Sequence, residues 1–506
     1  MTTIVLGLDG ANWPLIEPWI DDGTLPNIDR LRENGLWGVS ESVLPPVTCP
    51  NWKCYASSRS PGAHDVYWWD TIDKTTFEVE MPDSRSFSAP ELWDYLDDAG
   101  YTVGVMNLPM SYPPRPVDGF VIAGGPQTEE SGYTYPESLQ TELERRDGYR
   151  VHPESMVSAD GHRGVEETLT LIQTRFETAE RLLSERDLDF FHLTIFYNNV
   201  LQHHFWNGEP VKRAWKIIDE HVGRLLDEAE TLVLMSDHGC TEIETVFYVN
   251  EWLEREGYLS LDSSLADYLM RIGVTQERVG TYVSRLGFKD VVDEFVPDWL
   301  VRRFPHDDGI KHQGKFAKVD FEESVAIGSG QGLVYLLEPP SSPRYESVRD
   351  EIVEGLSKVT TPKGTSVATA IHRGEELYPD GDPKYRPDIV FQQRAGVHAY
   401  GAVGYGQVMD EPQHWRAENV PAGLFLAFGE RVAAGRLDPI SILDIAPTVL
   451  YAMGESIPRD FEGDPVEAAH VARGEPTYRE PLPPRGAESG PTETVRTRLA
   501  DIGYLE

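Results

Sequence analysis

The chain has few cysteines and no long apolar run, and each scarcity excludes a class of protein. Only three of its 506 residues are cysteine, namely Cys49, Cys54 and Cys240. They predict neither a disulfide framework nor a paired-cysteine metal site, and they favour a reducing, cytoplasmic compartment. No apolar run approaches the roughly 18 residues of a membrane-spanning helix. The first residues lack the basic start of a signal peptide, so we expect neither a membrane anchor nor a cleaved leader.

Basic residues are also scarce, since 45 Lys and Arg stand against 84 Asp and Glu, for a formal net charge of -39. This balance argues against a nucleic-acid-binding surface and against anionic membranes, because both require a basic patch. The acidic residues are dispersed and the hydrophobic content is ordinary, which excludes a disordered chain. Dispersed acidity with little Lys is typical of proteins from salt-loving organisms, where salt screens the self-repulsion. An ordinary acidic cytoplasmic protein is the alternative.

Short apolar runs alternate with helical patterns along the chain. The early strands are expected at residues 4–8, 102–105, 190–196 and 231–235. The helices between them are expected at residues 25–34, 89–99, 165–186 and 211–229. This alternation predicts an α/β fold with a mostly parallel central sheet and helices on both of its faces.

The later part of the chain changes in character. Residues 256–317 have helical periodicity without a strong strand and are interpreted as an inserted helical cap, which divides a core of residues 1–255 and 318–470. Residues 471–506 are interpreted as a C-terminal tail with a short helix near its end. The Pro-, Gly- and Tyr-rich residues 106–165 are expected to form long loops near a functional site.

Polar side chains follow several of the expected strands. The run at 231–235 ends in Ser236, Asp237, His238 and Gly239, and Asp9 follows the first strand. Ligands of open α/β sheets bind beyond the carboxyl ends of the strands, where carboxylates and imidazoles can hold a metal ion. A turn carboxylate is the simpler reading of each residue alone.

Three further positions complete the set of candidates. Thr48 lies on a proline-flanked turn at an expected helix start, where a helix cap is the alternative role. Asn199 and His203 are four residues apart, on one face of a helical turn. His414 precedes a late apolar run at 423–428.

Eight short motifs occur in the order of a known family. They are GLDG at 7–10, PVTCPNW at 46–52, SPGAH at 60–64, QHHFW at 202–206, SDHG at 236–239, NEWL at 250–253, His414 ahead of GLF at 423–425, and DIAPT at 444–448. With them the chain resembles the alkaline-phosphatase superfamily, in its type I phosphodiesterase/nucleotide pyrophosphatase branch and of halophilic archaeal type. The resemblance implies an alkaline-phosphatase-like three-layer sandwich as the catalytic core, with an inserted cap.

The resemblance also implies a pair of divalent ions, with zinc expected and manganese as the alternative. One ion would be held by Asp9, Thr48, Asp237 and His238, and the second by Asn199, His203 and His414. Two cations neutralise a phosphate ester and clamp its attacking and leaving oxygens. Thr48 would be the nucleophile and would form a phosphothreonine intermediate.

Two positions depart from the family pattern. The family has Asp at the position of Asn199, and a neutral amide oxygen is a poorer ligand for a divalent ion. Nucleotide pyrophosphatases carry an Asn shortly after the motif that ends at His64, where this chain reads DVYWWD at 65–70. The second departure argues against nucleotide diesters as the substrate.

The sequence therefore predicts a metal-dependent hydrolase of small-molecule phosphate esters, with diesters favoured over monoesters. A sulfatase-like relative is an alternative, although neither Cys49 nor Cys54 lies in the required C-x-P-x-R context. A phosphomutase is another. The third is a one-metal or inactive protein that binds a phosphorylated ligand, because of Asn199. Oligomeric state and the residues that bind the substrate are left open.

Overall fold

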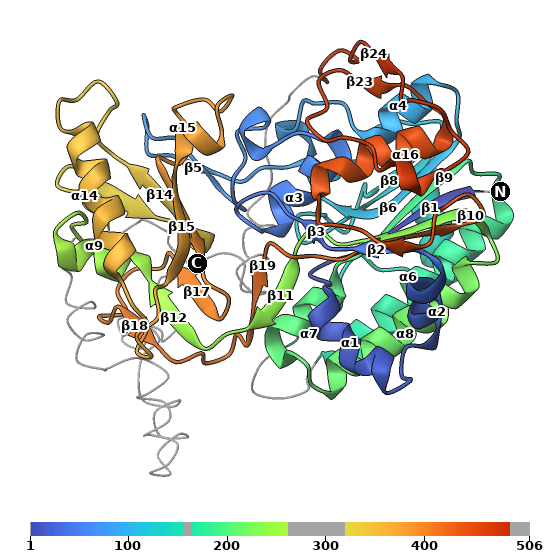
Figure 1. Ribbon diagram of the computed structural model, residues 1–506, viewed down its shortest axis with the longest axis horizontal. Helices are drawn as coiled ribbons and strands as arrows, with labels where there is room; N and C mark the ends of the chain where they lie inside the picture. Colours follow the sequence, from blue (N-terminus) through green and yellow to red (C-terminus); the bar gives the residue numbers. More distant parts are fainter. Residues whose placement is uncertain (1, 156, 158–163, 262–318, 486–506) are drawn as a thin grey trace, which may run out of the picture. The chain divides into compact units, whose positions relative to one another are not determined.

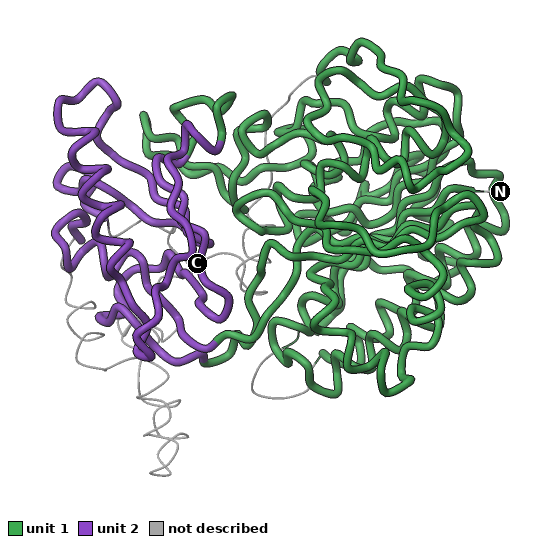
Figure 2. The backbone as a smooth tube through the Cα atoms, in the orientation of Figure 1, with its two compact units in different colours: residues 1–243, 378–386, 413–502 green, residues 244–377, 387–412, 503–506 purple. Residues whose placement is uncertain are grey.

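The computed structural model describes residues 2–155, 157, 164–261 and 319–485 (Figure 1). The chain forms two compact units (Figure 2). The first contains residues 1–243, 378–386 and 413–502, and the second contains residues 244–377, 387–412 and 503–506. Each unit brings together segments that lie far apart in the sequence.

A nine-stranded sheet forms the centre of the first unit, in the order β21-β2-β20-β10-β1-β9-β6-β7-β8. The five strands from β10 to β7 are mutually parallel. They are β10 Ala229–Met235, β1 Thr2–Leu8, β9 Phe190–Ile195, β6 Val103–Pro109 and β7 Gly119–Gly124. The remaining strands are β20 Phe425–Gly429, β2 Leu36–Gly38, β21 Gly435–Arg436 and β8 Thr134–Tyr135.

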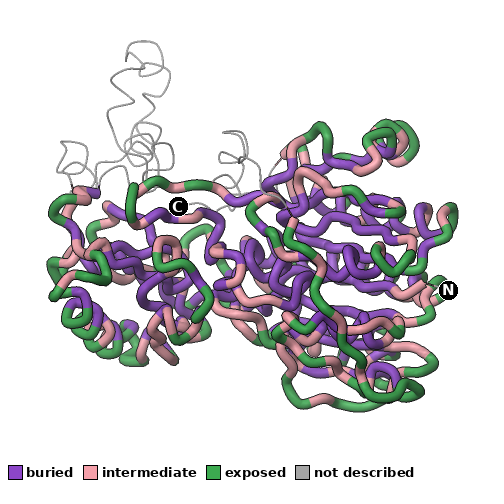
Figure 3. Tube along the Cα trace, turned by 90° about the horizontal axis from the view of Figure 1, so that it is seen from above, coloured by how far each residue is buried: buried purple, intermediate pink, exposed green. Residues whose placement is uncertain are grey.

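Helices cover both faces of this sheet, as Figure 1 shows. On one face pack α3 Thr48–Ser57, α4 Leu92–Asp98 and α16 Ile445–Met453. On the other lie α1 Trp13–Asp21, α2 Pro26–Asn34, α6 Val165–Glu185, α7 Tyr197–Phe205 and α8 Glu209–Leu225. Every residue of β9 is buried, and β1 is buried from Ile4 onward, as expected for strands covered on both faces. Figure 3 marks the buried segments along the chain.

Short elements complete the first unit. They are β3 Ser40–Glu41 with β22 Ile440–Ser441, β4 Thr71–Ile72 with β5 Val79–Glu80, β11 Gly239–Glu242 with β19 Ala417–Val420, β23 Ile457–Pro458 with β24 Tyr478–Arg479, and helix α5 Ser138–Asp147. Of these, β11 matters most for the site, because it starts directly after His238.

The second unit has two small sheets. An antiparallel sheet contains β13 Ala326–Gly328, β14 Leu333–Leu336, β16 Ile389–Gln393 and β15 Ala368–Arg373. The other contains β17 Val397–Tyr400, β12 Thr245–Tyr248 and β18 Met409–Asp410. The helices of this unit are α9 Val249–Glu256, α14 Tyr345–Lys358 and α15 Gly374–Leu377.

The predicted α/β architecture with a mostly parallel central sheet is confirmed. One sequence interpretation is wrong: residues 106–165 are not only loops, because they contain β7, β8 and α5. Proline and glycine flank the short apolar run of β7 and hide its strand pattern. The second unit gathers residues 319–377 and 387–412, which the sequence analysis had grouped with the core.

Two predicted segments are not covered by the structure. Most of the expected cap at 256–317, and the expected helix within the 471–506 tail, lie outside the described residues. Both stay predictions. Within the described part of the chain, no helix combines the length and the apolar character that crossing a membrane demands.

Asp219 on α8 caps the neighbouring helix α2, whose own first residues provide no side-chain cap. Its carboxylate accepts the backbone N–H groups of Asn27 at 3.0 Å and Ile28 at 2.8 Å. We expect Asp219→Ala to lower the free energy of unfolding by about 1–3 kcal/mol, because buried donors lose their acceptor. Urea unfolding measures the change. The exposed neighbour Glu220→Ala is the control and should stay within about 0.5 kcal/mol of the parent protein. Equal effects of the two substitutions would contradict the capping role.

Candidate functional site

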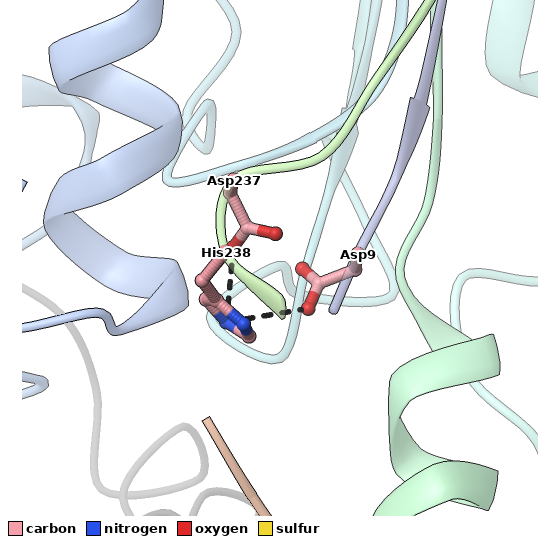
Figure 4. A group of neighbouring side chains, drawn as sticks. All are labelled: Asp9, Asp237 and His238. Atoms are coloured by element: carbon pink, nitrogen blue, oxygen red, sulfur yellow. Dashed lines mark ion pairs between the residues drawn. The ribbon is translucent and has the colours of Figure 1, made fainter. Parts of the chain in front are cut away.

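Two carboxylates meet where β1 and β10 end. The strands are parallel neighbours with Gly7 opposite Met235, so the residues that follow them, Asp9 and Asp237, share one edge of the sheet (Figure 4). Both side chains are fully buried. The turn at Gly10 has a φ of 67°, which favours glycine, and its backbone N–H donates to Asp237 Oδ1 at 3.2 Å. The predicted pairing of these strand ends is therefore present.

His238 extends the pair to three ligand groups. Its Nδ1 lies 2.9 Å from the carbonyl oxygen of Gly239, which can only accept, so Nδ1 carries the proton. The basic Nε2 therefore faces the carboxylates, 3.2 Å from Asp237 Oδ2 and 3.8 Å from Asp9 Oδ1. Burial lowers the pKa of His238 to about 4, so the ring is neutral at pH 7.

Thr48 is the first residue of α3, and the helix start aims its hydroxyl at this group. Its Oγ1 lies 3.3 Å from Asp9 Oδ1 and 3.1 Å from His238 Nε2. Thr48 is completely buried. Val47 before it is extended, and α3 begins without a side-chain cap at that position. The N-terminal end of α3 therefore points its partial positive charge toward the same place.

Burial makes the two carboxylates costly to ionise. It raises the pKa of Asp9 to about 7, although hydrogen bonds from Trp52, Asn199 and Thr48 oppose the shift. Burial and the charge of Asp9 raise the pKa of Asp237 well above its usual range. A bound cation would offset both penalties, because it would stabilise the charged forms.

The donor set fits a divalent metal ion. Ligand atoms of Asp9, Asp237 and His238 all lie within 4.8 Å of one another. Asp237 Oδ2 is buried and accepts no hydrogen bond from any residue that the structure describes. Two carboxylates, one neutral imidazole and a hydroxyl suit zinc or manganese.

Trp52, for which the sequence predicted no role, holds Asp9 in place. Trp52 Nε1 donates to Asp9 Oδ2 at 2.8 Å. Gly7 makes room for this ring, since a Cβ there would lie 2.5 Å from Trp52 Cη2. Such partners around a ligand orient it and tune its affinity for a metal. The shared motifs at 7–10 and 46–52 were the signal that could have indicated this contact.

The structure brings part of the predicted second ion set to the same edge. Asn199 on α7 donates through Nδ2 to Asp9 Oδ1 at 2.8 Å. His203, one turn later, has Nδ1 2.7 Å from the carbonyl oxygen of Ala417, which leaves Nε2 as its basic nitrogen. Its ring stacks on Trp415 with the centroids 3.9 Å apart. Asn199 thus contacts the first group of ligands directly.

His414 is placed differently from the other candidates. Its side chain is exposed. Among the residues with described positions, the group of acidic and histidine side chains able to hold a metal contains neither His203 nor His414. Their role as ligands, like that of Asn199, stays a prediction.

Comparisons with known proteins identify the family. The family model described as type I phosphodiesterase/nucleotide pyrophosphatase matches residues 3–328, which is more than half of the chain. The chain belongs to this family. It is therefore a phosphoric ester hydrolase, and the family is generally dependent on divalent metals. A search of curated protein sequences gave no significant match.

Solved structures share the fold of this family member at low sequence identity. Phosphonoacetate hydrolase from Sinorhizobium meliloti, in complex with phosphonoformate, matches with a TM-score of 0.57 and 17% identity, over 88% of this chain and 94% of the other. Human ectonucleotide pyrophosphatase/phosphodiesterase 5 matches with a TM-score of 0.50 and 13% identity, over 91% and 97%. Both likenesses concern the fold.

The raised pKa of Asp237 predicts how the metal-free protein responds to pH. A carboxyl group whose pKa is raised in the folded state binds its proton more tightly there than in the unfolded chain. The free energy of unfolding therefore falls as the pH rises above the pKa of the unfolded chain, near 4. We expect metal-free Asp237→Asn to be more stable than the parent protein at pH 8, with a smaller difference at pH 5. Saturation with zinc should make the parent protein the more stable of the two at pH 8, because its Asp237 carboxylate binds the ion and the variant lacks this carboxylate. Urea unfolding with and without a chelator measures this. A parent protein more stable than the variant at pH 8 without metal would refute the prediction.

Proposed function

We propose that this chain hydrolyses phosphate esters with Thr48 as the nucleophile, beside a divalent ion held by Asp9, Asp237 and His238. The observation that carries the proposal is the position of the Thr48 hydroxyl. It lies within hydrogen-bond distance of Asp9, which follows β1, and of His238, which follows β10. A capping threonine would need no such contacts, and α3 has no side-chain cap from this residue.

The reaction proceeds in two balanced steps. Thr48 Oγ1 bonds to phosphorus, its proton passes to an acceptor, and the bond from phosphorus to the ester oxygen breaks, which releases an alcohol after protonation. Asp9 Oδ1 is the acceptor in reach of the hydroxyl proton, because Nε2 of His238 would be engaged as a ligand of the ion. In the second step the oxygen of a water molecule bonds to phosphorus, the bond from phosphorus to Oγ1 breaks, and a proton from that water restores the Thr48 hydroxyl.

Several features support the phosphoryl group as the one that reacts here. A bound divalent ion would supply a positive charge that neutralises the ester and lowers the pKa of the hydroxyl. The first turn of α3 adds backbone N–H groups, which favour anions at a helix start. Both act at the position of Thr48.

Within this proposal the ion is zinc or manganese, and the substrate is a small-molecule phosphate ester. The family branch favours diesters. Cys49, next to Thr48, is fully buried, and burial raises the pKa of its thiol. A buried, protonated thiol is inert, which argues against the sulfatase-like alternative.

We also retain a high-salt cytoplasm as the proposed setting. The formal net charge of -39 supports high salt, because screening would relieve the repulsion. The three cysteines are free and buried, which fits a reducing compartment.

Replacement of the nucleophile tests the proposal. Thr48→Ala should lower the turnover of bis(p-nitrophenyl) phosphate at least on the order of 10³-fold, because no hydroxyl remains to attack phosphorus. Thr48→Ser should retain part of the activity. Release of p-nitrophenol, with zinc or manganese added, measures the rates.

The matched control is Thr170→Ala on the exposed side of α6, which should leave turnover unchanged. A chelator should abolish turnover of the parent enzyme, and added metal should restore it. If Thr48→Ala hydrolysed the diester as fast as the parent, Thr48 would not be the nucleophile.

A further inference from the structure

The hydrogen bonds around Asn199 fix the direction in which its amide points. Nδ2 lies 2.8 Å from Asp9 Oδ1, and an ionised carboxylate can only accept. The amide oxygen of Asn199 lies 3.2 Å from Gln202 Nε2. That nitrogen in turn lies 3.1 Å from the carbonyl oxygen of Gly10, which also can only accept. No other orientation of the two amides satisfies both acceptors.

The amide of Gln202 is held from its other end as well. Gln202 Oε1 accepts from Asn198 Nδ2 and from Trp215 Nε1, both at 3.4 Å. Asn198 Nδ2 also donates to the backbone oxygen of Asp9 at 2.7 Å. Asn199, Gln202 and Trp215 are fully buried. Asn199 is thus the last member of a chain of amides that ends on Asp9.

The charge balance distinguishes the two predicted ion positions. The group at Asp9, Asp237 and His238 has two carboxylates, which match the charge of one divalent ion. Asn199, His203 and His414 would offer a second ion an amide and two imidazoles, all neutral. Neutral ligands offset the charge of a divalent ion less than carboxylates do, so a second ion would be held more weakly than the first.

A further buried carboxylate lies on β19. Glu418 is close enough to Cys240 to raise the pKa of that thiol, and its Oε1 accepts the backbone N–H of Asn419 at 2.7 Å. It is not one of the predicted ligands.

We propose that Asn199 is a positioning residue whose N–H holds Asp9 in the place of a second cation, so that the centre binds a single divalent ion. This inference rests on the metal centre of the proposed function. An aspartate at position 199 would face Asp9 across the same 2.8 Å, and two carboxylates at that distance need a cation or a shared proton between them. The amide N–H removes this requirement.

The test counts bound ions in the parent protein and in Asn199→Asp. Both are stripped of metal, equilibrated with Zn²⁺, passed through a weak chelator to remove surface ions, and analysed by mass spectrometry of the metal. We expect about one ion per chain in the parent and about two in Asn199→Asp. Asn34→Asp on the exposed end of α2 is the charge-matched control and should retain the parent count.

Thermal unfolding of the same metal-free samples gives a second measurement that does not depend on turnover. Metal-free Asn199→Asp should unfold at a lower temperature than the metal-free parent, and Zn²⁺ should remove the difference. Asn34→Asp should unfold like the parent in both conditions.

About two ions per chain in the parent would overturn the inference. A count of one in a folded Asn199→Asp would overturn it too, because Asn199 would not set the number. If the variant does not fold, the parent count alone decides. Turnover of the parent separates the two proposals: an active parent with two ions contradicts only this inference, whereas a parent that binds no metal and hydrolyses no phosphate ester contradicts the proposed function.

Discussion

Two carboxylates buried side by side are the constraint on which the rest of the site depends. Asp9 and Asp237 follow adjacent parallel strands and have no exposure to water. Donors from Trp52, Asn199 and Thr48 surround Asp9, whereas Asp237 Oδ2 faces the basic nitrogen of His238. Hydrogen bonds alone leave this much negative charge poorly compensated, so the arrangement is stable in its ionised form only with a cation. This need for a cation agrees with the family's general dependence on divalent metals.

The packing around the carboxylates also sets the position of Thr48, the proposed nucleophile. Thr48 belongs to α3, which lies in the core against α4 and α16, so its hydroxyl is held by a rigid element. Trp52 of the same helix reaches Asp9 because Gly7 has no side chain. One helix therefore provides both the proposed attacking hydroxyl and the hydrogen bond that supports Asp9. A shift of α3 would disturb both at once.

The sequence predicted the parts of the site that local pattern encodes. The apolar run before Asp237 identifies β10, and the parallel order of β1 and β10 places Asp9 beside it. β7 and α5 were missed because proline and glycine interrupt the patterns around them. The bond from Asn199 to Asp9 joins residues 190 positions apart, and the direction of an amide depends on its packed neighbours. No local pattern could have shown it, and the same holds for the exposed position of His414.

The most direct measurement is anomalous X-ray diffraction from crystals grown with zinc, recorded on both sides of the zinc absorption edge. We expect a strong anomalous peak bounded by Asp9, Thr48, Asp237 and His238, at distances of about 2.0–2.2 Å from their ligand atoms. An empty position between these residues, or zinc bound only elsewhere on the chain, would show that they do not form a metal centre.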